Sequence, residues 1–146
     1  MPEENKNLVR RWFEEAWNKR RISAIPEMYH PSGRAHGFPE PDSVLTGPEE
    51  FAAVCKNFYE TFGDIHITVD DLIAEGDKVA VRWTATMTHT GHGLGFPATS
   101  QQVKLPGSSF LICGNGMILD GWNQMDFTRV QMQLKESALR QVSVMA

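Results

Sequence analysis

The chain has 146 residues, of which 41% are hydrophobic and 22% are charged, which suits one domain with a single core. Its formal net charge of −4 excludes a basic surface for nucleic acid and a polybasic membrane patch. No apolar run approaches the roughly 20 residues of a membrane-spanning helix, and the N-terminus lacks the apolar stretch of a secretory signal. We therefore expect a single cytoplasmic domain over residues 1–146.

The first part of the chain predicts helices. Hydrophobic residues recur at helical spacing between residues 3 and 19, which indicates an amphipathic helix. A shorter helix is expected from about Ser23 to Tyr29. The proline-rich segment 30–42 is expected to be irregular, apart from a brief extended piece at 34–36. Thr46 can then cap a helix whose apolar positions repeat as far as Phe62.

The rest of the chain predicts mainly strands. Alternating apolar residues begin at Ile65, with a bulge expected before Leu72, and a turn at 75–77 leads into a second strand that reaches about Thr90. A glycine-rich loop is expected at 91–97. Two further strands, at 102–113 and 116–126, are joined by a tight turn, and a closing helix is expected at 127–140. Helices followed by antiparallel strands predict an α+β fold, in which helices cover one face of a curved sheet and enclose a pocket.

The last predicted strand places several polar side chains on one face. By strand alternation, Asp120, Trp122, Gln124 and Asp126 lie on the same side. A carboxylate beside an aromatic wall loses solvation, which suits it to proton transfer. Asp126 is therefore the candidate catalytic residue, and Trp122 is a candidate wall of the pocket. The alternative is that Asp126 simply caps the helix that follows it.

Three blocks of the sequence resemble the SnoaL-like polyketide cyclases, which share the cone-shaped fold of nuclear transport factor 2 and ketosteroid isomerase. The first block is 7–29, and the second runs from Val81 to Thr99. The third, Gly116 to Asp126, is similar to the family's G-x-I-x-E-x-W-x-x-x-D strand. In contrast, the apolar run 110–112 stands where a cyclase would present polar partners for substrate carbonyls.

The resemblance implies an NTF2-like, cystatin-like roll with its N-terminal helices packed in the concave face of a curved, mostly antiparallel sheet. It implies an interior pocket that needs no cofactor, and a homodimer or homotetramer. It also implies that Asp126 acts as acid and base in an intramolecular aldol closure, with a small hydrophobic carbonyl-containing molecule as the partner.

The remaining pocket candidates come from other parts of the chain. His36 lies in the proline-rich segment, where this fold often contributes a polar pocket residue; the alternative is a surface histidine. Arg82 could orient an anionic substrate or form a structural ion pair. His89 and His92 are three residues apart without a third ligand at recognisable spacing, so no metal site is predicted. The other substrate-binding candidates are Tyr29, Trp83 and His89.

Three classes of function fit these features. The first is a cofactor-independent enzyme that cyclises a polyketide-like substrate, or a related isomerase or dehydratase. The second is a module that binds a small hydrophobic ligand without chemistry. The third is an interaction domain that dimerises through the open face of its sheet. The two cysteines, Cys55 and Cys113, form no metal or disulfide motif and are expected to be reduced.

Overall fold

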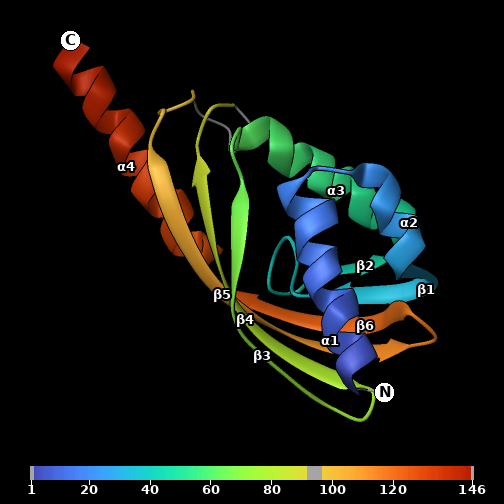
Figure 1. Ribbon diagram of the computed structural model, residues 1–146. Helices are drawn as coiled ribbons and strands as arrows, with labels where there is room; N and C mark the ends of the chain where they lie inside the picture. The colour runs from blue at the N-terminus through green and yellow to red at the C-terminus, as the bar shows by residue number, and fades with distance from the viewer. Residues whose placement is uncertain (1, 92–96, 146) are drawn as a thin grey trace.

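The computed structural model describes residues 2–91 and 97–145 (Figure 1). Helix α1 (Pro2–Arg11) continues directly into a π-helical segment, η1 (Trp12–Asn18). The predicted helix over 3–19 is therefore confirmed, although its second half is wound more widely than an α-helix. Within η1 the four apolar side chains, which include Trp12 and Trp17, are all buried.

The chain then turns through two short helices into the sheet. These are η2 (Ile22–Ala24) and α2 (Ile25–Met28), and strand β1 (Tyr29–His36) follows at once. The predicted extended piece at 34–36 is confirmed as part of β1, and 37–43 is irregular as expected, but the strand begins earlier than predicted, at Tyr29. Pro31 is tolerated because it lies in a register break of β1, where its missing N–H interrupts no regular pairing.

Strand β2 (Val44–Thr46) leads into helix α3 (Gly47–Thr61), and four long strands follow. They are β3 (His66–Glu75), β4 (Lys78–Thr88), β5 (Gln102–Gly114) and β6 (Met117–Met125). The strand order across the sheet is β2-β1-β6-β5-β4-β3. The register shift between Val69 and Asp71 confirms the predicted bulge. Most of the predicted loop 91–97, including His92, lies outside the described residues.

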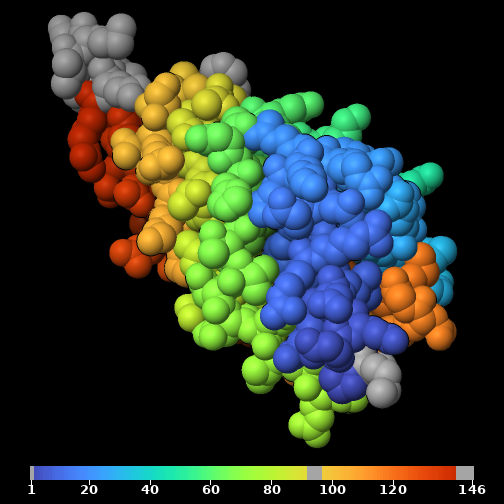
Figure 2. All heavy atoms as spheres, viewed as in Figure 1, coloured from blue at the N-terminus to red at the C-terminus, as the bar shows by residue number. Residues whose placement is uncertain are grey.

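The sheet is mixed, because β1 and β6 run parallel while the other pairs are antiparallel. It curves around the N-terminal helices and α3, as the ribbon in Figure 1 shows. This is the α+β architecture of the NTF2-like fold that the sequence predicted. On the face drawn in Figure 2, the blue N-terminal residues pack against the green β3 region. None of the described helices is long and apolar enough to cross a membrane.

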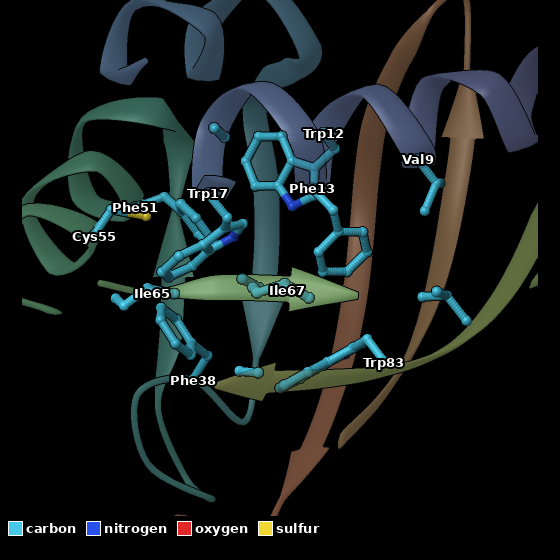
Figure 3. Packing of buried hydrophobic residues seen from close by; sticks show 14 of the residues in the cluster. Val9, Trp12, Phe13, Trp17, Phe38, Phe51, Cys55, Ile65, Ile67 and Trp83 are labelled. Atoms are coloured by element: carbon cyan, nitrogen blue, oxygen red, sulfur yellow. The ribbon is translucent and has the colours of Figure 1, made fainter. Parts of the chain in front are cut away.

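The core fills the space between the helices and the concave face of the sheet. Figure 3 shows Trp12, Phe13 and Trp17 extending from η1 toward the strands, where Ile67 and Trp83 meet them. The edges of aromatic rings pack against ring faces around Trp17, a geometry that favours aromatic pairs beyond their buried area. The inner wall of the fold is thus aromatic.

Asn18 joins the end of η1 to the open edge of β3. Its Nδ2 donates to the carbonyl oxygen of Ile67 at 2.9 Å, and its Oδ1 accepts from the Ile67 N–H at 2.6 Å. One side chain therefore satisfies both backbone groups of an edge residue, in the way that a neighbouring strand would.

Helix α4 (Phe127–Met145) closes the chain and extends away from the main body (Figure 1). It runs five residues beyond the predicted end at Arg140. Val130 and Leu134 are buried near its start. Asp126 precedes the helix, and its Oδ1 accepts from the N–H of Arg129 at 3.2 Å, which is the geometry of an N-cap.

We predict that Asn18→Ala lowers the free energy of unfolding by about 1–3 kcal/mol, because the Ile67 backbone groups lose their partners. Urea denaturation measures the change. The neighbouring exposed residue provides the control, since Lys19→Ala should stay within about 0.5 kcal/mol of the original protein. Equal effects of the two substitutions would show that the edge contact contributes nothing.

We also predict that Asp126→Ala lowers the free energy of unfolding by about 0.5–2 kcal/mol through loss of the cap. Asp126→Asn should retain most of that stability, because asparagine caps helices about as well as aspartate. Circular dichroism during thermal unfolding compares the two variants. A stability unchanged by the alanine would contradict the capping role.

Candidate functional site

An apolar cavity of about 70 Å³ lies between the helical layer and the inner face of the sheet. Trp12, Phe13 and Trp17 line its helical side, and Tyr29 and Trp83 contribute from the strands. Tyr29 and Trp83 were predicted from the sequence to bind substrate, and both line this cavity. No carboxylate, imidazole or thiol is among the described residues of its wall. The cavity can therefore hold an apolar group but supplies no general base of its own.

Three polar side chains on the cavity wall are joined by hydrogen bonds. The indole Nε1 of Trp83 donates to Ser109 Oγ at 3.1 Å, and Ser109 Oγ donates to Asn123 Oδ1 at 2.7 Å. Asn123 Nδ2 in turn donates to the backbone oxygen of His36 at 3.1 Å. This chain of hydrogen bonds crosses β4, β5 and β6. It satisfies groups that would otherwise carry a desolvation cost inside the fold.

Tyr29 has its hydroxyl group committed to the backbone. The Tyr29 hydroxyl donates a hydrogen bond to the backbone carbonyl oxygen of Leu45, and the two oxygens are 3.2 Å apart. Burial is the main reason that the pKa of Tyr29 lies above its usual value, and the negative charges of Asp120 and Glu50 add to the effect. The hydroxyl therefore stays protonated at neutral pH and positions β1 against β2.

A larger groove of about 700 Å³ lies beside the cavity, where β1 and β6 end. The segment 36–41, the last turns of α3, the end of β6 and the start of α4 surround it. Its volume falls in the range typical of small-molecule sites. Amide side chains from three elements reach this groove, and they are Asn57, Asn123, Gln124 and Gln131.

His36 and Glu40 are the ionisable residues among the described lining of this groove, and His36 pairs with Asp120. His36 Nε2 lies 2.8 Å from Asp120 Oδ1, and the His36 ring is on the groove wall. Since a carboxylate only accepts hydrogen bonds, Nε2 is the ring nitrogen that carries the hydrogen in this contact. The other carboxylate oxygen accepts from Arg34 Nη2 at 3.0 Å. The Asp120 side chain is only 12% exposed, so both partners hold it firmly.

Strand pairing and stacking fix the His36 ring. His36 pairs with Trp122 across the parallel β1–β6 ladder, and their rings stack with centroids 5.0 Å apart and planes within 4°. Asp120 Oδ1 also accepts from the Gly121 N–H at 3.0 Å. His36 and Trp122 are thus the two predicted substrate-binding residues that the fold brings together at the groove.

Asp126 lies elsewhere than the sequence suggested. The alternation of β6 turns Asp120, Trp122 and Gln124 to the outer face, whereas Gly121 and Asn123 face the cavity. Asp126 continues the outer series, is exposed, and caps α4. It borders neither the cavity nor the groove. Of the two alternatives for Asp126, the structure shows the helix cap, and no contact here tests a catalytic role.

Two other candidates also lie away from both spaces. Arg82 is exposed on the outer face of β4, where its Nε and Nη2 donate to Asp71 Oδ2 at 2.9 and 2.6 Å. This is the structural ion pair that the sequence analysis considered for Arg82 beside substrate orientation. His89 is fully buried, and its Nδ1 accepts from the N–H of Thr99 at 3.1 Å. Neither side chain reaches the groove or the cavity.

Sequence reasoning missed the roles of Arg34, Ser109 and Asn123 in the site. The face shared by Asp120 and Trp122 was predicted, but the partner strand was not, because parallel pairing of β1 with β6 leaves no local signal. A histidine and an arginine two residues apart in 34–36 could have indicated a strand face with two cationic or polar side chains.

The cysteines do not belong to the site. Cys55 and Cys113 are both free and buried. Burial raises the pKa of the Cys113 thiol to about 11, so this sulfur is protonated and unreactive at neutral pH. The described residues contain no group of three or more metal-ligating side chains.

Solved structures with a similar fold place the chain among known proteins. They include a candidate SnoaL-like polyketide cyclase from Jannaschia sp. CCS1, at 23% identity and TM-score 0.82, with 91% of this chain and 92% of that chain covered. TsrD from Streptomyces laurentii has 26% identity and TM-score 0.77, over 90% of this chain and 95% of that one. A protein from Catenulispora acidiphila with a ketosteroid isomerase-like fold has 16% identity and TM-score 0.66, over 80% and 83%.

None of the curated proteins matches the sequence closely enough to be named as a relative. The family model of the SnoaL-like polyketide cyclases, however, matches residues 7–134, which is most of the chain and ends within α4. This match agrees with the architecture that the structural neighbours share. The chain belongs to the SnoaL-like polyketide cyclase family.

Proposed function

We propose that this protein is a cofactor-independent enzyme that performs acid–base chemistry on a small carbonyl-containing molecule, with His36 as the base. The observation that carries the proposal is the 2.8 Å contact between His36 Nε2 and Asp120 Oδ1 on the wall of a groove of about 700 Å³. A histidine oriented by a buried carboxylate is a common arrangement for a general base.

The proposed reaction is an intramolecular aldol closure. His36 Nδ1 removes a proton from a carbon next to one carbonyl, and the resulting enolate carbon attacks a second carbonyl of the same molecule. A carbon–carbon bond forms, and the new alkoxide takes the proton back from the imidazolium. Substrate and product are isomers, so no further reactant is needed. The amides of Asn57 and Gln131 face the same groove and can donate to the carbonyl oxygens.

Asp120 acts as a positioning residue in this scheme. Its carboxylate holds the Nε2–H of His36 and stabilises the imidazolium that forms when Nδ1 takes a proton. Arg34 and the Gly121 N–H fix the carboxylate from two further directions. Trp122 restricts the ring from its face. The base is therefore preorganised before substrate binds, which lowers the cost of reaching the transition state.

The similar solved structures support this class of chemistry. Several are described as candidate polyketide cyclases, including one from Jannaschia sp. CCS1 and IdmH from Streptomyces antibioticus. An isomerase remains the alternative, because the same abstraction followed by proton return to a different carbon moves a double bond instead of closing a ring. A non-catalytic binder would use the apolar cavity alone, and its function would not require the His36–Asp120 pair.

We predict that His36→Gln lowers kcat by roughly 10²- to 10⁴-fold, because it removes the base. Asp120→Asn should also lower kcat, since the amide can donate as well as accept and no longer fixes one orientation of the ring. The probe is a phenyl-bearing diketone whose carbonyls are separated by three methylene groups. Chromatography measures its closure to a hydroxycyclohexanone.

Asp126→Asn is the matched control for these two variants. It makes the same change from carboxylate to amide as Asp120→Asn, but at the exposed cap of α4. We expect its kcat to stay within about twofold of the original enzyme, consistent with the small effects of most exposed substitutions. Loss of turnover in Asp126→Asn with normal turnover in His36→Gln would assign the chemistry to Asp126 and reject His36.

A second candidate function is association of two copies through the outer face of the sheet. One cross-strand row on that face consists of paired residues from five strands, and these are His36, Trp122, Phe110, Ala80 and Ile73. Phe110 is 43% exposed, Trp122 is 41% exposed and Ile73 is 68% exposed. Adjacent exposed apolar side chains of this size are typical of protein–protein contacts.

We predict that Phe110→Lys shifts the protein toward the monomer, because a charge in the middle of this row opposes burial of the face. Sedimentation velocity at several protein concentrations measures the shift. Leu139, an exposed apolar residue of α4, gives the control variant Leu139→Lys. An unchanged sedimentation coefficient for Phe110→Lys would exclude this face as the contact.

A further inference from the structure

We infer that the groove beside the His36–Asp120 pair selects a substrate that carries a protonated amine, and that Glu40 recognises this group. The inference rests on the proposed function and names the class of its substrate: a carbonyl compound with an ammonium group on a flexible arm. It starts from the charges of the groove wall. Among the described residues of that wall, Glu40 is the one with a formal charge, and none is a lysine or an arginine.

The loop that follows β1 holds Glu40 with little freedom. The Gly37 N–H donates to the carbonyl oxygen of Ser43 at 2.9 Å, and the Ser43 N–H donates to the carbonyl oxygen of Glu40 at 3.0 Å. These two hydrogen bonds close the loop on itself. Glu40 also lies between Pro39 and Pro41, whose rings restrict the backbone on both sides of it. The loop therefore presents the Glu40 side chain from a stiff backbone.

Phe38 anchors the same loop in the core. Its buried ring stacks on Phe51 and on Phe58, with centroids 5.4 Å apart in both pairs. Phe58 in turn lines the groove. The loop is thus fixed against the groove wall before any ligand arrives, which lowers the entropy that binding would otherwise cost.

The carboxylate of Glu40 is left for a ligand, whereas other carboxylates of the chain are paired. Asp71 pairs with Arg82, and Asp120 pairs with Arg34. Within residues 2–91 and 97–145, the Glu40 side chain takes part in none of the ion pairs or side-chain hydrogen bonds, and only its backbone carbonyl is bonded. A negative charge that is held in a groove without a counter-charge attracts a ligand that supplies one.

Aromatic rings on the groove wall favour the same sign of charge. Phe58, Phe62, Trp122 and Phe127 all line the groove, and the ring centroids of Phe58 and Phe127 are 5.3 Å apart. The faces of such rings attract cations, and they offer no comparable attraction to a carboxylate or a phosphate. An alkyl-substituted ammonium can pack its carbons against these rings and donate its N–H to Glu40.

The two helix ends at the groove do not change this sign. Helix α3 ends there, so its last carbonyls bring partial negative charge, while the first N–H groups of α4 bring partial positive charge. The carboxylate of Asp126 caps α4 and offsets that positive end. The contributions of the helices oppose each other, and the charge of Glu40 decides which ligand is preferred.

Glu40 is close enough to the proposed base to act on the same substrate molecule. His36 and Glu40 both line the groove and are four residues apart in the sequence. Their Cα atoms therefore lie no more than about 14 Å apart, the span of a fully extended chain of that length. A short flexible arm can join a carbonyl at His36 to an ammonium group at Glu40.

The experiment compares two diketones in which a three-carbon arm replaces the phenyl group of the turnover assay. One arm ends in dimethylammonium, and the other ends in isopropyl, which has nearly the same shape without charge. A tertiary amine is used because it cannot condense with the ketones. We expect the original protein to have a higher kcat/KM for the ammonium compound. Glu40→Gln should lower the ratio of the two kcat/KM values by roughly tenfold or more, the scale of one charge-assisted hydrogen bond.

Asp42→Asn is the matched control for Glu40→Gln. Asp42 is an exposed residue of the same loop and does not line the groove. It loses the same charge, and its ratio should stay within about twofold of the original, in line with most exposed substitutions. Added salt should lower the ratio in the original protein and leave it unchanged in Glu40→Gln, because ions screen an exposed charge.

Glu40→Lys gives a second, independent variant. It should favour a third diketone whose arm ends in a carboxylate, which is a gain that partial unfolding cannot produce. A ratio of one or less in the original protein overturns the inference. An equal fall in Glu40→Gln and Asp42→Asn also overturns it, since the overall charge of the loop and not the contact with Glu40 would then set the preference.

A binding measurement separates this inference from the proposed function. Monoketones with the same two arms lack the second carbonyl and cannot close, so isothermal titration calorimetry measures their binding alone. The original protein and His36→Gln should both bind the ammonium monoketone roughly tenfold or more tighter than Glu40→Gln does. If His36→Gln keeps full turnover of the diketones, the proposed base is wrong while this difference still supports Glu40. If Glu40→Gln binds the ammonium monoketone as tightly as the original protein, the inference fails and the proposed base is unaffected.

Discussion

Strand β6 is the element on which the rest of the structure depends. It lies between β1 and β5, so its parallel ladder joins the N-terminal half of the chain to the antiparallel strands. The same strand separates the apolar cavity from the ionisable groups, because alternate side chains point to opposite faces of the sheet. Gly121 and Asn123 face the cavity, while Asp120 and Trp122 face outward toward β1. A shift of one residue would exchange these faces and dismantle both sites.

The separation of apolar space from ionisable groups follows from this arrangement. Aromatic residues of η1 and α3 pack against the concave face. Among the described residues that line the cavity the only charged one is Arg34, which pairs with Asp120. The carboxylate of Asp120 lies outside the cavity, where Arg34 and His36 each donate a hydrogen bond to one of its oxygens. Such a carboxylate is costly to bury alone but is tolerated when each oxygen has partners. The proposed chemistry therefore lies at the rim of the cone, outside the inner cavity.

Much of the fold could be predicted from the sequence because its signals are local. The helical repeat up to Phe62, the alternation of β4 and the bulge near Asp71 each depend on neighbouring residues only. The site was harder, since it depends on which strands pair. His36 and Trp122 were predicted separately, but nothing in the sequence placed them opposite each other in a parallel ladder. The sequence showed which side chains share a face of β6 with Asp126, but it left open whether Asp126 points into a pocket or caps the next helix, and the structure shows the cap.

The contact between Asn18 and the edge of β3 also bears on how the protein behaves at high concentration. A free strand edge offers unpaired N–H and C=O groups to the strands of other molecules, which can begin aggregation. Here the Asn18 amide occupies both groups of Ile67, and the bulge with Asp70 and Asp71 follows shortly after. The edge is therefore blocked at one end by a side chain and charged in its middle, which opposes edge-to-edge pairing between the sheets of separate molecules.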